Sequence, residues 1–426
     1  MKNIIKRILL YTHNVIGLGH AFRSLAVITA MRKWRKDIDF IVMTGSSVPQ
    51  VFFREAIEVV RLPGIKMEIN GSEHTLKPRY LKDIGISKIF DYRQKLIMET
   101  FDFFEPDVLI VEHNMAGLMN EIVPLLLRKS LRRGTSGDFA LVHLSRGILC
   151  GLTSIEIPYS NMSHMTGSLN ISHLYDFIYI LENREIIDFN REYFNSDPAV
   201  AEKIHYIGPI SHINPDELAG RNEVNKIFHL SKKPLILVNL SRHGRVVDMI
   251  NHLMASMERT GIKNDYEIII IIDPYMDQEK SLAIRTSPLC ENIKILPFSH
   301  NFPDLLNCSE LIVCRGGYNT VNEILLTGTK ALIIPEHHPS GEQERRVKHI
   351  PSDNITVKTE DEILGTNPDE IILELLKREK KKIPFKSDKY NAGLKIVNDL
   401  EQWREMKHLH RKGLSENDEV SNFTGY

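Results

Sequence analysis

The sequence predicts two consecutive doubly wound α/β domains, each with a parallel sheet covered by helices on both faces. The first observation is length, because 426 residues exceed what a single hydrophobic core usually serves. The second is an alternation of short apolar runs with amphipathic stretches, which is typical of βαβ units. The third is a break in this alternation at Tyr206–Pro215, where glycine and proline indicate a linker between domains.

The apolar runs predict strands that are rich in Ile, Leu and Val on both faces, as buried parallel strands are. In the first half they are Arg7–Tyr11, Phe40–Thr44, Val108–Glu112, Phe139–His143 and Phe177–Leu181. In the second half they are Pro234–Leu240, Glu267–Ile272, Ile293–Leu296, Leu311–Cys314 and Lys330–Ile334. The main helices are expected at His20–Arg35, Ser87–Phe104, Gly117–Arg132, Val246–Arg259, Tyr318–Thr327 and Gly341–Ile350.

These elements place an N-terminal Rossmann-like domain over residues 1–208 and a second one over residues 209–388. The amphipathic pattern at Tyr390–His410 predicts a final helix, over residues 389–411, that packs back on the first domain. The polar residues 412–426 have the composition of a disordered tail.

The composition excludes several classes of protein. With 54 Lys plus Arg against 55 Asp plus Glu, the chain has no overall field that would attract nucleic acid. No run reaches the roughly 18 apolar residues of a membrane span, and the run at Ile8–Leu10 is too short for a signal peptide. The four cysteines and the histidines show no metal-ligand spacing. We therefore expect a cytoplasmic protein with no metal site. The basic run Lys377–Lys382 is either a solvated linker or a contact with anionic lipid at the inner face of a membrane.

A glycine loop follows the first strand, over Thr12–His20. A strand, a glycine loop and a helix N-terminus together favour an anion, because free backbone N–H groups and the helix dipole point the same way. A dinucleotide fold is excluded because Phe22 stands at the third glycine position and the second strand ends without an acidic residue. His20 then either caps a turn or acts as a general base.

A second loop of the same kind is richer in chemistry. The segment Cys314–Glu323 again runs from a strand through a glycine pair into a helix. The pair, Gly316 and Gly317, lets the backbone approach a diphosphate closely, and polar side chains in the first helical turn can add hydrogen bonds. Glu323 lies one turn further on, where its carboxylate can accept hydrogen bonds from a ribose diol. The polar loop Pro335–Gln343 is placed to hold sugar hydroxyls.

At these residues the sequence resembles the GT-B glycosyltransferases of glycosyltransferase family 28, the family of the peptidoglycan N-acetylglucosaminyltransferase. It is most similar to the bacterial and archaeal glycosyltransferases whose N-terminus reads GxGHxxR and whose C-terminal half carries GYNTxxE. The segments that carry the resemblance are Gly19–Phe22, Leu25–Val27, Cys314–Glu323 and Pro335–Gln343.

The resemblance implies the GT-B fold, with two Rossmann-like domains facing a cleft and a C-terminal helix crossing back. It implies an acceptor-binding first domain, with Gly19 and His20 at the catalytic cleft, and a second domain that binds the nucleotide sugar. Within that domain, Glu323 would bind the ribose hydroxyls and Gln343 the donor sugar. The full set of implied or adjacent donor residues is Ser241, Arg242, His243, Gly244, Arg315, Gly316, Gly317, Tyr318, Asn319, Thr320, Glu323, Glu342 and Gln343.

The acceptor side is less closely constrained. Arg23 stands where the peptidoglycan enzyme has proline, so it is a candidate acceptor contact. His113 and Asn114 follow a strand at the carboxyl end of the sheet, where open α/β folds bind ligands, although a turn histidine explains His113 equally well. Asp37–Asp39 is formally a DxD motif, but it precedes a strand and is interpreted as a solvated turn. The adjacent His337 and His338 are interpreted as loop residues near the donor.

The expected activity is that of a metal-independent, inverting hexosyl- or hexosaminyltransferase. It would move a hexose or N-acetylhexosamine from a nucleotide diphosphate sugar, with UDP favoured, to a hydroxyl of a small molecule or glycan. No cofactor beyond this co-substrate is expected. A nucleotide-sugar hydrolase or 2-epimerase on the same fold is the alternative, and a non-catalytic nucleotide-sugar-binding protein is a third class.

Overall fold

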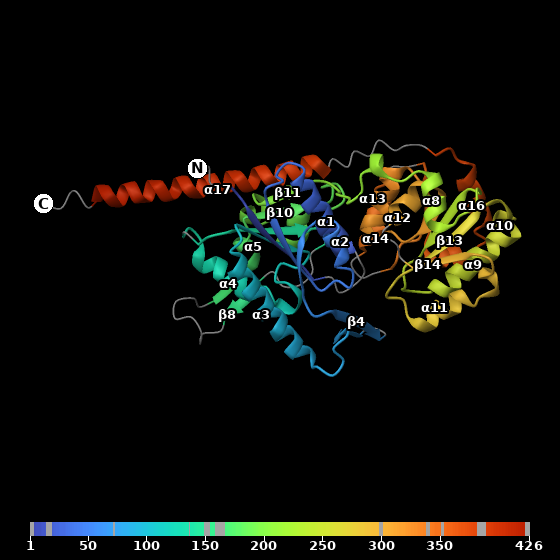
Figure 1. Ribbon diagram of the computed structural model, residues 1–426, viewed down its shortest axis with the longest axis horizontal. Helices are drawn as coiled ribbons and strands as arrows, with labels where there is room; N and C mark the ends of the chain where they lie inside the picture. The colour runs from blue at the N-terminus through green and yellow to red at the C-terminus, as the bar shows by residue number, and fades with distance from the viewer. Residues whose placement is uncertain are drawn as a thin grey trace. The chain divides into compact units, whose positions relative to one another are not determined.

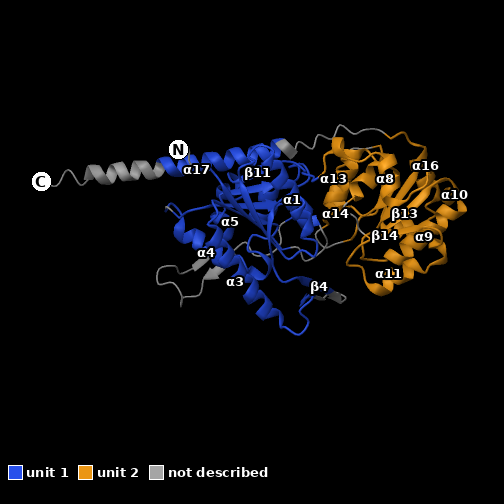
Figure 2. Cartoon of the chain, viewed as in Figure 1, with its two compact units in different colours: residues 1–212, 388–426 blue, residues 213–387 orange. Residues whose placement is uncertain are grey.

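The computed structural model describes residues 4–13, 19–70, 73–135, 137–148, 154–157, 167–297, 301–337, 341–350, 353–380 and 389–421. The chain divides into two compact units, coloured separately in Figure 2. Unit 1 contains residues 1–212 and 388–426, and unit 2 contains residues 213–387. The first division therefore falls after His212, slightly beyond the expected boundary at residue 208.

Unit 1 is built on a seven-stranded parallel sheet of order β11-β10-β7-β6-β1-β2-β3 (Figure 1). Its strands are β1 (Arg7–Thr12), β2 (Asp39–Thr44), β3 (Glu58–Arg61), β6 (Val108–Glu112), β7 (Ala140–Ser145), β10 (Phe177–Ile180) and β11 (Ile204–Tyr206). Two antiparallel hairpins pair β4 (Ile65–Asn70) with β5 (Glu73–Pro78) and β8 (Ser154–Ile157) with β9 (Gly167–Asn170). The helices are α1 (Gly19–Arg32), α2 (Gln50–Phe53), α3 (Ile86–Phe104), the 3₁₀ turn η1 (Leu118–Asn120), α4 (Val123–Arg132), α5 (Ile171–Leu174), α6 (Phe189–Phe194), α7 (Pro198–Ala201) and α17 (Lys389–Ser421).

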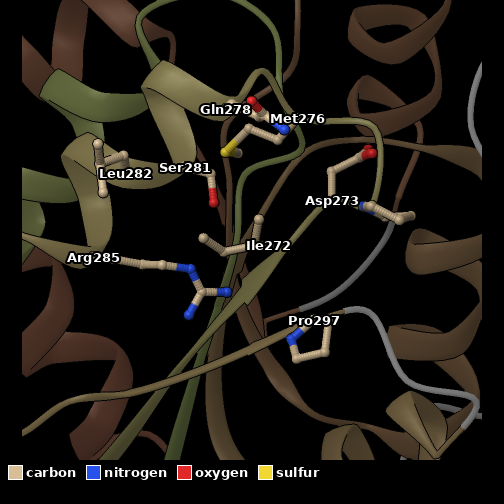
Figure 3. Close-up of a pocket in the computed structure, with 9 residues that line it drawn as sticks. Ile272, Asp273, Met276, Gln278, Ser281, Leu282, Arg285 and Pro297 are labelled. Carbon is tan, nitrogen blue, oxygen red and sulfur yellow. The ribbon is translucent and has the colours of Figure 1, made fainter.

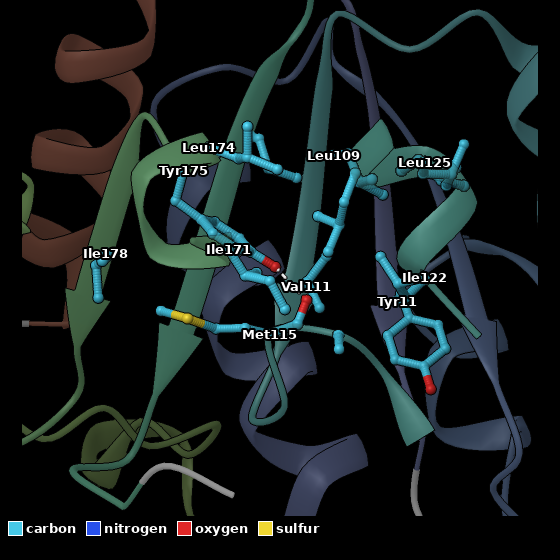
Figure 4. Close-up of a cluster of buried hydrophobic side chains, with 14 of the residues drawn as sticks. Tyr11, Leu109, Val111, Met115, Ile122, Leu125, Ile171, Leu174, Tyr175 and Ile178 are labelled. Atoms are coloured by element: carbon cyan, nitrogen blue, oxygen red, sulfur yellow. Dashed lines mark hydrogen bonds between the residues drawn. The ribbon is translucent and has the colours of Figure 1, made fainter. Parts of the chain in front are cut away.

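The core of unit 1 forms because alternate residues of each strand point to the same face of the sheet. Leu109 and Val111 of β6 point into one buried cluster, together with Leu125 of α4 and Ile171 of α5 (Figure 4). The hydroxyl of Tyr175 donates a hydrogen bond of 2.7 Å to the carbonyl oxygen of Met115 within this cluster. The cluster fixes the central strands, and therefore fixes the residues at their carboxyl ends.

Unit 2 is built on a six-stranded parallel sheet of order β14-β13-β12-β15-β16-β17. Its strands are β12 (Leu235–Asn239), β13 (Glu267–Ile272), β14 (Lys294–Pro297), β15 (Ser309–Cys314), β16 (Lys330–Ile333) and β17 (Ile355–Val357). Its helices are η2 (Pro215–Glu217), α8 (Arg221–Phe228), α9 (Val246–Arg259), α10 (Ile262–Asp265), α11 (Gln278–Arg285), η3 (Pro288–Cys290), α12 (Phe302–Asn307), α13 (Tyr318–Thr327), α14 (Glu342–Lys348), α15 (Glu360–Gly365) and α16 (Asp369–Lys377).

Both faces of the sheet in unit 2 are covered by helices. Ile236 and Val238 of β12 pack in a cluster with residues of α9, α15 and α16. Leu235 and Leu237 of the same strand pack in a second cluster with residues of α8, α12, α13 and α14. This confirms the prediction of a doubly wound sheet from strands that are apolar on both faces.

Three sequence expectations need correction. The helix expected at Gly117–Arg132 begins only at Val123, because Gly117 (φ 74°), Met119 (φ 49°) and Asn120 (φ 65°) have left-handed backbones that a helix cannot contain. The edge strands β3, β11 and β17 were not expected, since each is short and only partly buried and so lacks a continuous apolar run. The final helix α17 continues to Ser421, into the segment for which disorder was expected, because extending an existing helix is far easier than starting one.

Helix α17 belongs to unit 1, where it packs along α1. Gly393 of α17 lies directly against the backbone of Ala30 in α1. Polar contacts hold α17 on unit 1 as far as Lys407: Tyr179 donates to Asp399 (2.9 Å), Lys407 donates to Asp138 (2.9 Å) and Arg404 pairs with Asp107 (3.0 Å). In the part of the chain that the structure describes, the helices include none with the length and apolar character that crossing a bilayer requires.

The contact between Gly393 and Ala30 gives a stability prediction. A Cβ at residue 393 would overlap the carbonyl group of Ala30. We expect Gly393→Ala to lower the free energy of unfolding of unit 1 by about 1–3 kcal/mol, the range for overpacking, as measured by urea denaturation. Gly365→Ala is the matched control, because a Cβ at that helical glycine meets nothing within 4 Å. Equal stability of the Gly393→Ala variant and the wild type would show that α17 does not press on α1 here.

Candidate functional site

The polar residues of unit 1 gather at the carboxyl ends of β1 and β6. These strands are parallel neighbours, so the residues that follow them lie at the same edge of the sheet. His13 follows β1, Glu112 ends β6 and His113 follows it, while His20 is the second residue of α1. The ring centroid of His20 lies 4.7 Å from that of His13 and 4.9 Å from that of His113.

Glu112 is the anchor of this group. Its side chain is fully buried and forms an ion pair with Arg23, whose Nε donates to Oε1 at 2.9 Å. Its other oxygen, Oε2, lies 2.7 Å from Nδ1 of His20. Arg23 also approaches Nδ1 of His20, at 3.0 Å, which would require Nδ1 to accept. An ionised carboxylate can only accept, so the shorter contact requires Nδ1–H, and Nε2 carries the free lone pair.

Burial and charge set the protonation states of these groups. Burial alone would raise the pKa of Glu112, but the charge of Arg23 and the hydrogen bond from His20 outweigh it and hold that pKa well below its usual range. Burial lowers the pKa of His20, although Glu112 opposes the shift. Burial lowers the pKa of His13 to about 3 and that of His113 well below its usual range. The three imidazoles are therefore neutral at pH 7, and an ionised carboxylate lies behind one of them.

Two of the three imidazoles have ring nitrogens without partners. Nδ1 of His13 and Nδ1 of His113 are buried and make no hydrogen bond with any residue that the structure describes. His113 has a left-handed backbone (φ 73°), and its N–H donates to the carbonyl oxygen of Leu144 at 2.8 Å. Such a strained non-glycine residue is often found at a functional site.

The structure changes the roles expected of two residues in unit 1. Arg23 was a candidate acceptor contact, but it is 2% exposed and its guanidinium is directed to Glu112. It therefore positions the carboxylate instead. Asn114 was another candidate, but its side-chain oxygen accepts from the N–H of Ala116 at 3.1 Å and stabilises the loop. Glu112 was not predicted as a site residue from the sequence. Its position at the end of β6, the strand beside β1, is the sequence feature that could have indicated it.

Other expected residues of unit 1 lie close to this group or outside the described chain. Gly19 is the first residue of α1, next to His20. Residues 14–18, which complete the first glycine loop, lie outside the described residues. His13, at the start of that loop, was not singled out from the sequence, because its closeness to His113 depends on the pairing of β1 with β6.

In unit 2 the expected donor residues gather around the N-terminus of α13, which follows β15. Gly317 precedes the helix, and a Cβ added to it would meet nothing within 4 Å, so there is open space beside this backbone. The next side chain, Tyr318, is buried under the guanidinium of Arg346, whose carbon lies 5.2 Å from the ring centroid. The partly exposed Asn319 and Thr320 complete the first turn. A ten-residue helix thus presents its N-terminal backbone N–H groups and its positive dipole end at this point.

Glu323 lies one turn into α13 and is 4% exposed. Burial raises the pKa of this carboxyl to about 8. It is therefore protonated in the unliganded protein at neutral pH. A strongly shifted carboxyl in this position is typical of a functional site.

Arg315 has a different role from the one expected. It was a candidate donor-binding residue, but it is 5% exposed and binds the protein itself. It donates to the carbonyl oxygens of Leu240 (3.1 Å), Ile334 (3.2 Å) and His243 (3.3 Å), and it forms an ion pair with Glu360. Arg315 therefore joins the loops that follow β12, β15 and β16, which are the loops that carry the expected donor residues.

The loop after β12 is held in a conformation that needs glycine. Ser241 (φ 60°) and Gly244 (φ 63°) both have left-handed backbones. A Cβ at Gly244 would lie 2.6 Å from Oε1 of Glu360. Burial lowers the pKa of His243 in this loop. The left-handed backbone and the close approach to Glu360 therefore explain why glycine stands at residue 244.

The remaining donor candidates make contacts within unit 2. Gln343 accepts from the N–H of Glu336 at 2.9 Å through Oε1. Glu342 pairs with Arg346 at 2.6 Å. His337 is exposed, and His338 lies outside the described residues. These contacts fix the loop between β16 and α14 near Gly316, whose added Cβ would lie 3.3 Å from that of Gln343.

A cavity of about 340 Å³ opens at the carboxyl ends of β13 and β14 (Figure 3). It is lined by Ile272, Asp273, Pro274, Met276, Gln278, Ser281, Leu282, Arg285 and Pro297. None of the expected donor residues lines it, but Asp273 pairs with Arg242 at 3.2 Å. Arg242 also lies over the ring of Tyr275, with its guanidinium carbon 5.4 Å from the centroid.

Comparison with known proteins identifies related enzymes. Residues 245–401 match the glycosyltransferase family 28 C-terminal domain. The UDP-N-acetylglucosamine–N-acetylmuramyl-(pentapeptide) pyrophosphoryl-undecaprenol N-acetylglucosamine transferase of Bacillus cytotoxicus is 27% identical over 339 residues, which cover 78% of this chain and 80% of that enzyme. The enzyme of the same name from Leuconostoc mesenteroides is 26% identical over 332 residues, covering 77% of this chain and 78% of that enzyme.

Solved structures show where else the fold occurs. The UDP-N-acetylglucosamine 2-epimerase of Neisseria meningitidis matches with a TM-score of 0.60 at 14% identity, over 92% of this chain and 99% of that one. A UDP-glucosyltransferase from Polygonum tinctorium matches with a TM-score of 0.53 at 12% identity, over 95% of this chain and 99% of that one. At these identities the likeness concerns the fold.

Two doubly wound parallel-sheet units in one chain, with the C-terminal helix packed on the first, define the GT-B class of α/β proteins. The matching domain and the related enzymes identify the activity within that class. This chain is a glycosyltransferase, and its residues 245–401 match the family 28 C-terminal domain.

The buried pair of Glu112 and Arg23 gives a prediction about the site in unit 1. Glu112→Gln leaves an unpaired guanidinium in the interior, and Arg23→Met leaves an unpaired carboxylate. Each change should lower the free energy of unfolding by about 3–5 kcal/mol, because an uncompensated buried charge remains.

The double variant should cost clearly less than the sum of the two single changes, since it buries neither charge. Urea denaturation of the wild type and the three variants completes the cycle. If the losses in free energy of unfolding were strictly additive, the two charges would not stabilise each other.

Proposed function

We propose that the chain transfers a hexose or N-acetylhexosamine from a uridine diphosphate sugar to a hydroxyl of a glycan acceptor. The transfer inverts the anomeric carbon and needs no metal cofactor. The observation that carries the proposal is the neutral His20 ring, fixed by the buried Glu112, in a chain that contains the family 28 domain. The related enzymes are named for UDP-N-acetylglucosamine and an N-acetylmuramyl-(pentapeptide) pyrophosphoryl-undecaprenol, which supports a UDP-sugar donor and a glycan acceptor.

Unit 2 supplies the donor site in this proposal. The N-terminus of α13 and the open backbone of Gly317 suit a diphosphate, because amide N–H groups and the helix dipole stabilise negative charge. The same groups stabilise the charge that develops on the leaving diphosphate, which is the role a metal ion has in other enzymes. Glu323, one turn further along, binds the ribose hydroxyls.

Unit 1 supplies the base. The lone pair on Nε2 of His20 takes the proton of the acceptor hydroxyl while the hydroxyl oxygen bonds to the anomeric carbon. The bond from that carbon to the diphosphate oxygen breaks, and the nucleoside diphosphate leaves with the electron pair. The proton remains on an imidazolium, which the Glu112 carboxylate stabilises through the hydrogen bond from Nδ1.

His20→Ala tests the base. Because a general base accelerates the chemical step by roughly 10²–10⁴-fold, kcat should fall by about this factor. Affinity for the UDP-sugar should be unchanged, since that site belongs to unit 2. Steady-state kinetics and calorimetry on the same preparation measure both quantities, with His252→Ala, on α9, as the control. A normal kcat in a folded His20→Ala variant would end the case for this base.

Glu323→Ala tests the donor site and should give the opposite pattern. Above pH 8, where Glu323 is ionised, affinity for the UDP-sugar should weaken by about 1.5–3 kcal/mol, the range for hydrogen bonds to a charged group. Since burial raises the pKa of Glu323 to about 8 and the ionised form is the better acceptor, wild-type affinity should rise with pH up to about 8 and then level off. Glu323→Gln should lack this rise. Unchanged affinity in Glu323→Ala would remove the residue from the donor site.

A further inference from the structure

Three histidines from separate parts of unit 1 form a compact group. His13, His20 and His113 each offer one ring nitrogen, and the three nitrogens lie within 4.8 Å of one another. The residues are 9%, 7% and 7% exposed. The mechanism above uses His20 alone, so it leaves His13 and His113 without a role.

The unpartnered nitrogens are the observation that points to a ligand. Buried polar atoms in folded proteins are almost always hydrogen-bonded, and each exception calls for an explanation. Here Nδ1 of His13 and Nδ1 of His113 have no partner among the described residues. Two such atoms in one group, beside the Nε2 of a third imidazole, point to a ligand that ring nitrogens can bind.

The contact behind His20 is typical of metal-binding histidines. A ligand histidine usually donates its other ring N–H to a carboxylate or carbonyl, which fixes the ring and raises its basicity. The Glu112 carboxylate accepts from Nδ1 of His20 in this way, at 2.7 Å. Arg23 neutralises Glu112, while Arg146 adds a positive charge that acts on both His20 and His113 and opposes a cation.

The chemistry of the ligands selects the ion. Three imidazoles suit borderline-soft ions such as Zn²⁺, Ni²⁺ and Cu²⁺, whereas Mg²⁺, Mn²⁺ and Ca²⁺ prefer oxygen. Tetrahedral zinc with Zn–N distances of about 2.0–2.1 Å needs ligand nitrogens roughly 3.4 Å apart. The separations of up to 4.8 Å are therefore too wide for zinc as they stand. Rotation of the His13 and His113 rings, whose Nδ1 atoms have no hydrogen-bond partner among the described residues, would close the site.

We propose that His13, His20 and His113 bind one Zn²⁺ ion, and that this ion inhibits sugar transfer by occupying Nε2 of His20. The site is an inhibitory one, because the same nitrogen cannot bind the ion and take a proton from the acceptor. The inhibitory part rests on the proposed function, whereas binding of the ion does not.

Binding is measured first, on the full chain freed of metal by chelation and without any sugar nucleotide. Calorimetric titration with Zn²⁺ should show one tight equivalent, and Co²⁺ in its place should give the intense visible absorption of a tetrahedral site. His13→Gln and His113→Asn should each weaken binding by at least about tenfold. Asparagine is chosen at residue 113 because it tolerates the left-handed backbone there. His252→Ala, which removes a histidine of unit 2, should bind as the wild type does.

Inhibition is measured next, with the same variants. Added Zn²⁺ should reduce wild-type turnover and excess chelator should restore it, while His13→Gln and His113→Asn should resist the ion. Equal zinc affinity in the wild type and both variants, with unchanged melting temperatures, would overturn the site. Zinc bound at the three histidines without loss of turnover would overturn the inhibitory role. Absence of transfer from any UDP-sugar, with zinc binding intact, would instead count against the proposed function.

Discussion

The ion pair between Glu112 and Arg23 is the interaction on which the site in unit 1 depends. A buried carboxylate without a partner costs several kcal/mol, so Glu112 can stay ionised at the end of β6 only because Arg23 lies beside it. One carboxylate oxygen then accepts a hydrogen bond from the guanidinium, and the other accepts one from His20. The pair therefore decides which nitrogen of His20 carries the proton, and it keeps the other nitrogen available for an acceptor hydroxyl or a metal ion. Arg315 has the corresponding structural role in unit 2, where it joins three loops.

Much of the fold could be predicted from the sequence because its central elements carry strong local signals. The strands Val108–Glu112 and Glu267–Ile272 and the helices Val246–Arg259 and Tyr318–Thr327 have the predicted bounds. Each is a continuous apolar run or a clear amphipathic repeat, bounded by turn residues or charges. The short edge strands were not predicted because each pairs with only one other strand and is only partly buried, so its sequence carries no long apolar run. The break before α4 escaped because left-handed residues such as Met119 leave little trace in sequence.

The candidate site could be predicted only where its residues belong to one segment. Gly317 immediately precedes α13 and Glu323 lies within it, and His20 follows a glycine loop, so local pattern was enough to select them. Glu112 and His13 lie in the sequence far from their partners, and their roles arise from the pairing of β1 with β6. The metal-ligand spacing rule failed to find the three histidines for the same reason, since His113 comes from a segment far from the loop that contains His13 and His20. Arg23 and Arg315 were assigned to ligands because a conspicuous arginine in a motif carries no sign of being buried against protein oxygens.

The protonation of the His20 ring tests the central claim most directly. Nitrogen NMR of the metal-free chain, labelled with ¹⁵N at its histidine side chains and assigned by comparison with His20→Gln, distinguishes a protonated from an unprotonated ring nitrogen. At pH 7 we expect one neutral tautomer for His20, with the proton on Nδ1 and an unprotonated Nε2, because the Glu112 carboxylate can only accept a hydrogen bond. A proton on Nε2 would contradict it, because His20 could then neither serve as the base nor bind the ion through that nitrogen.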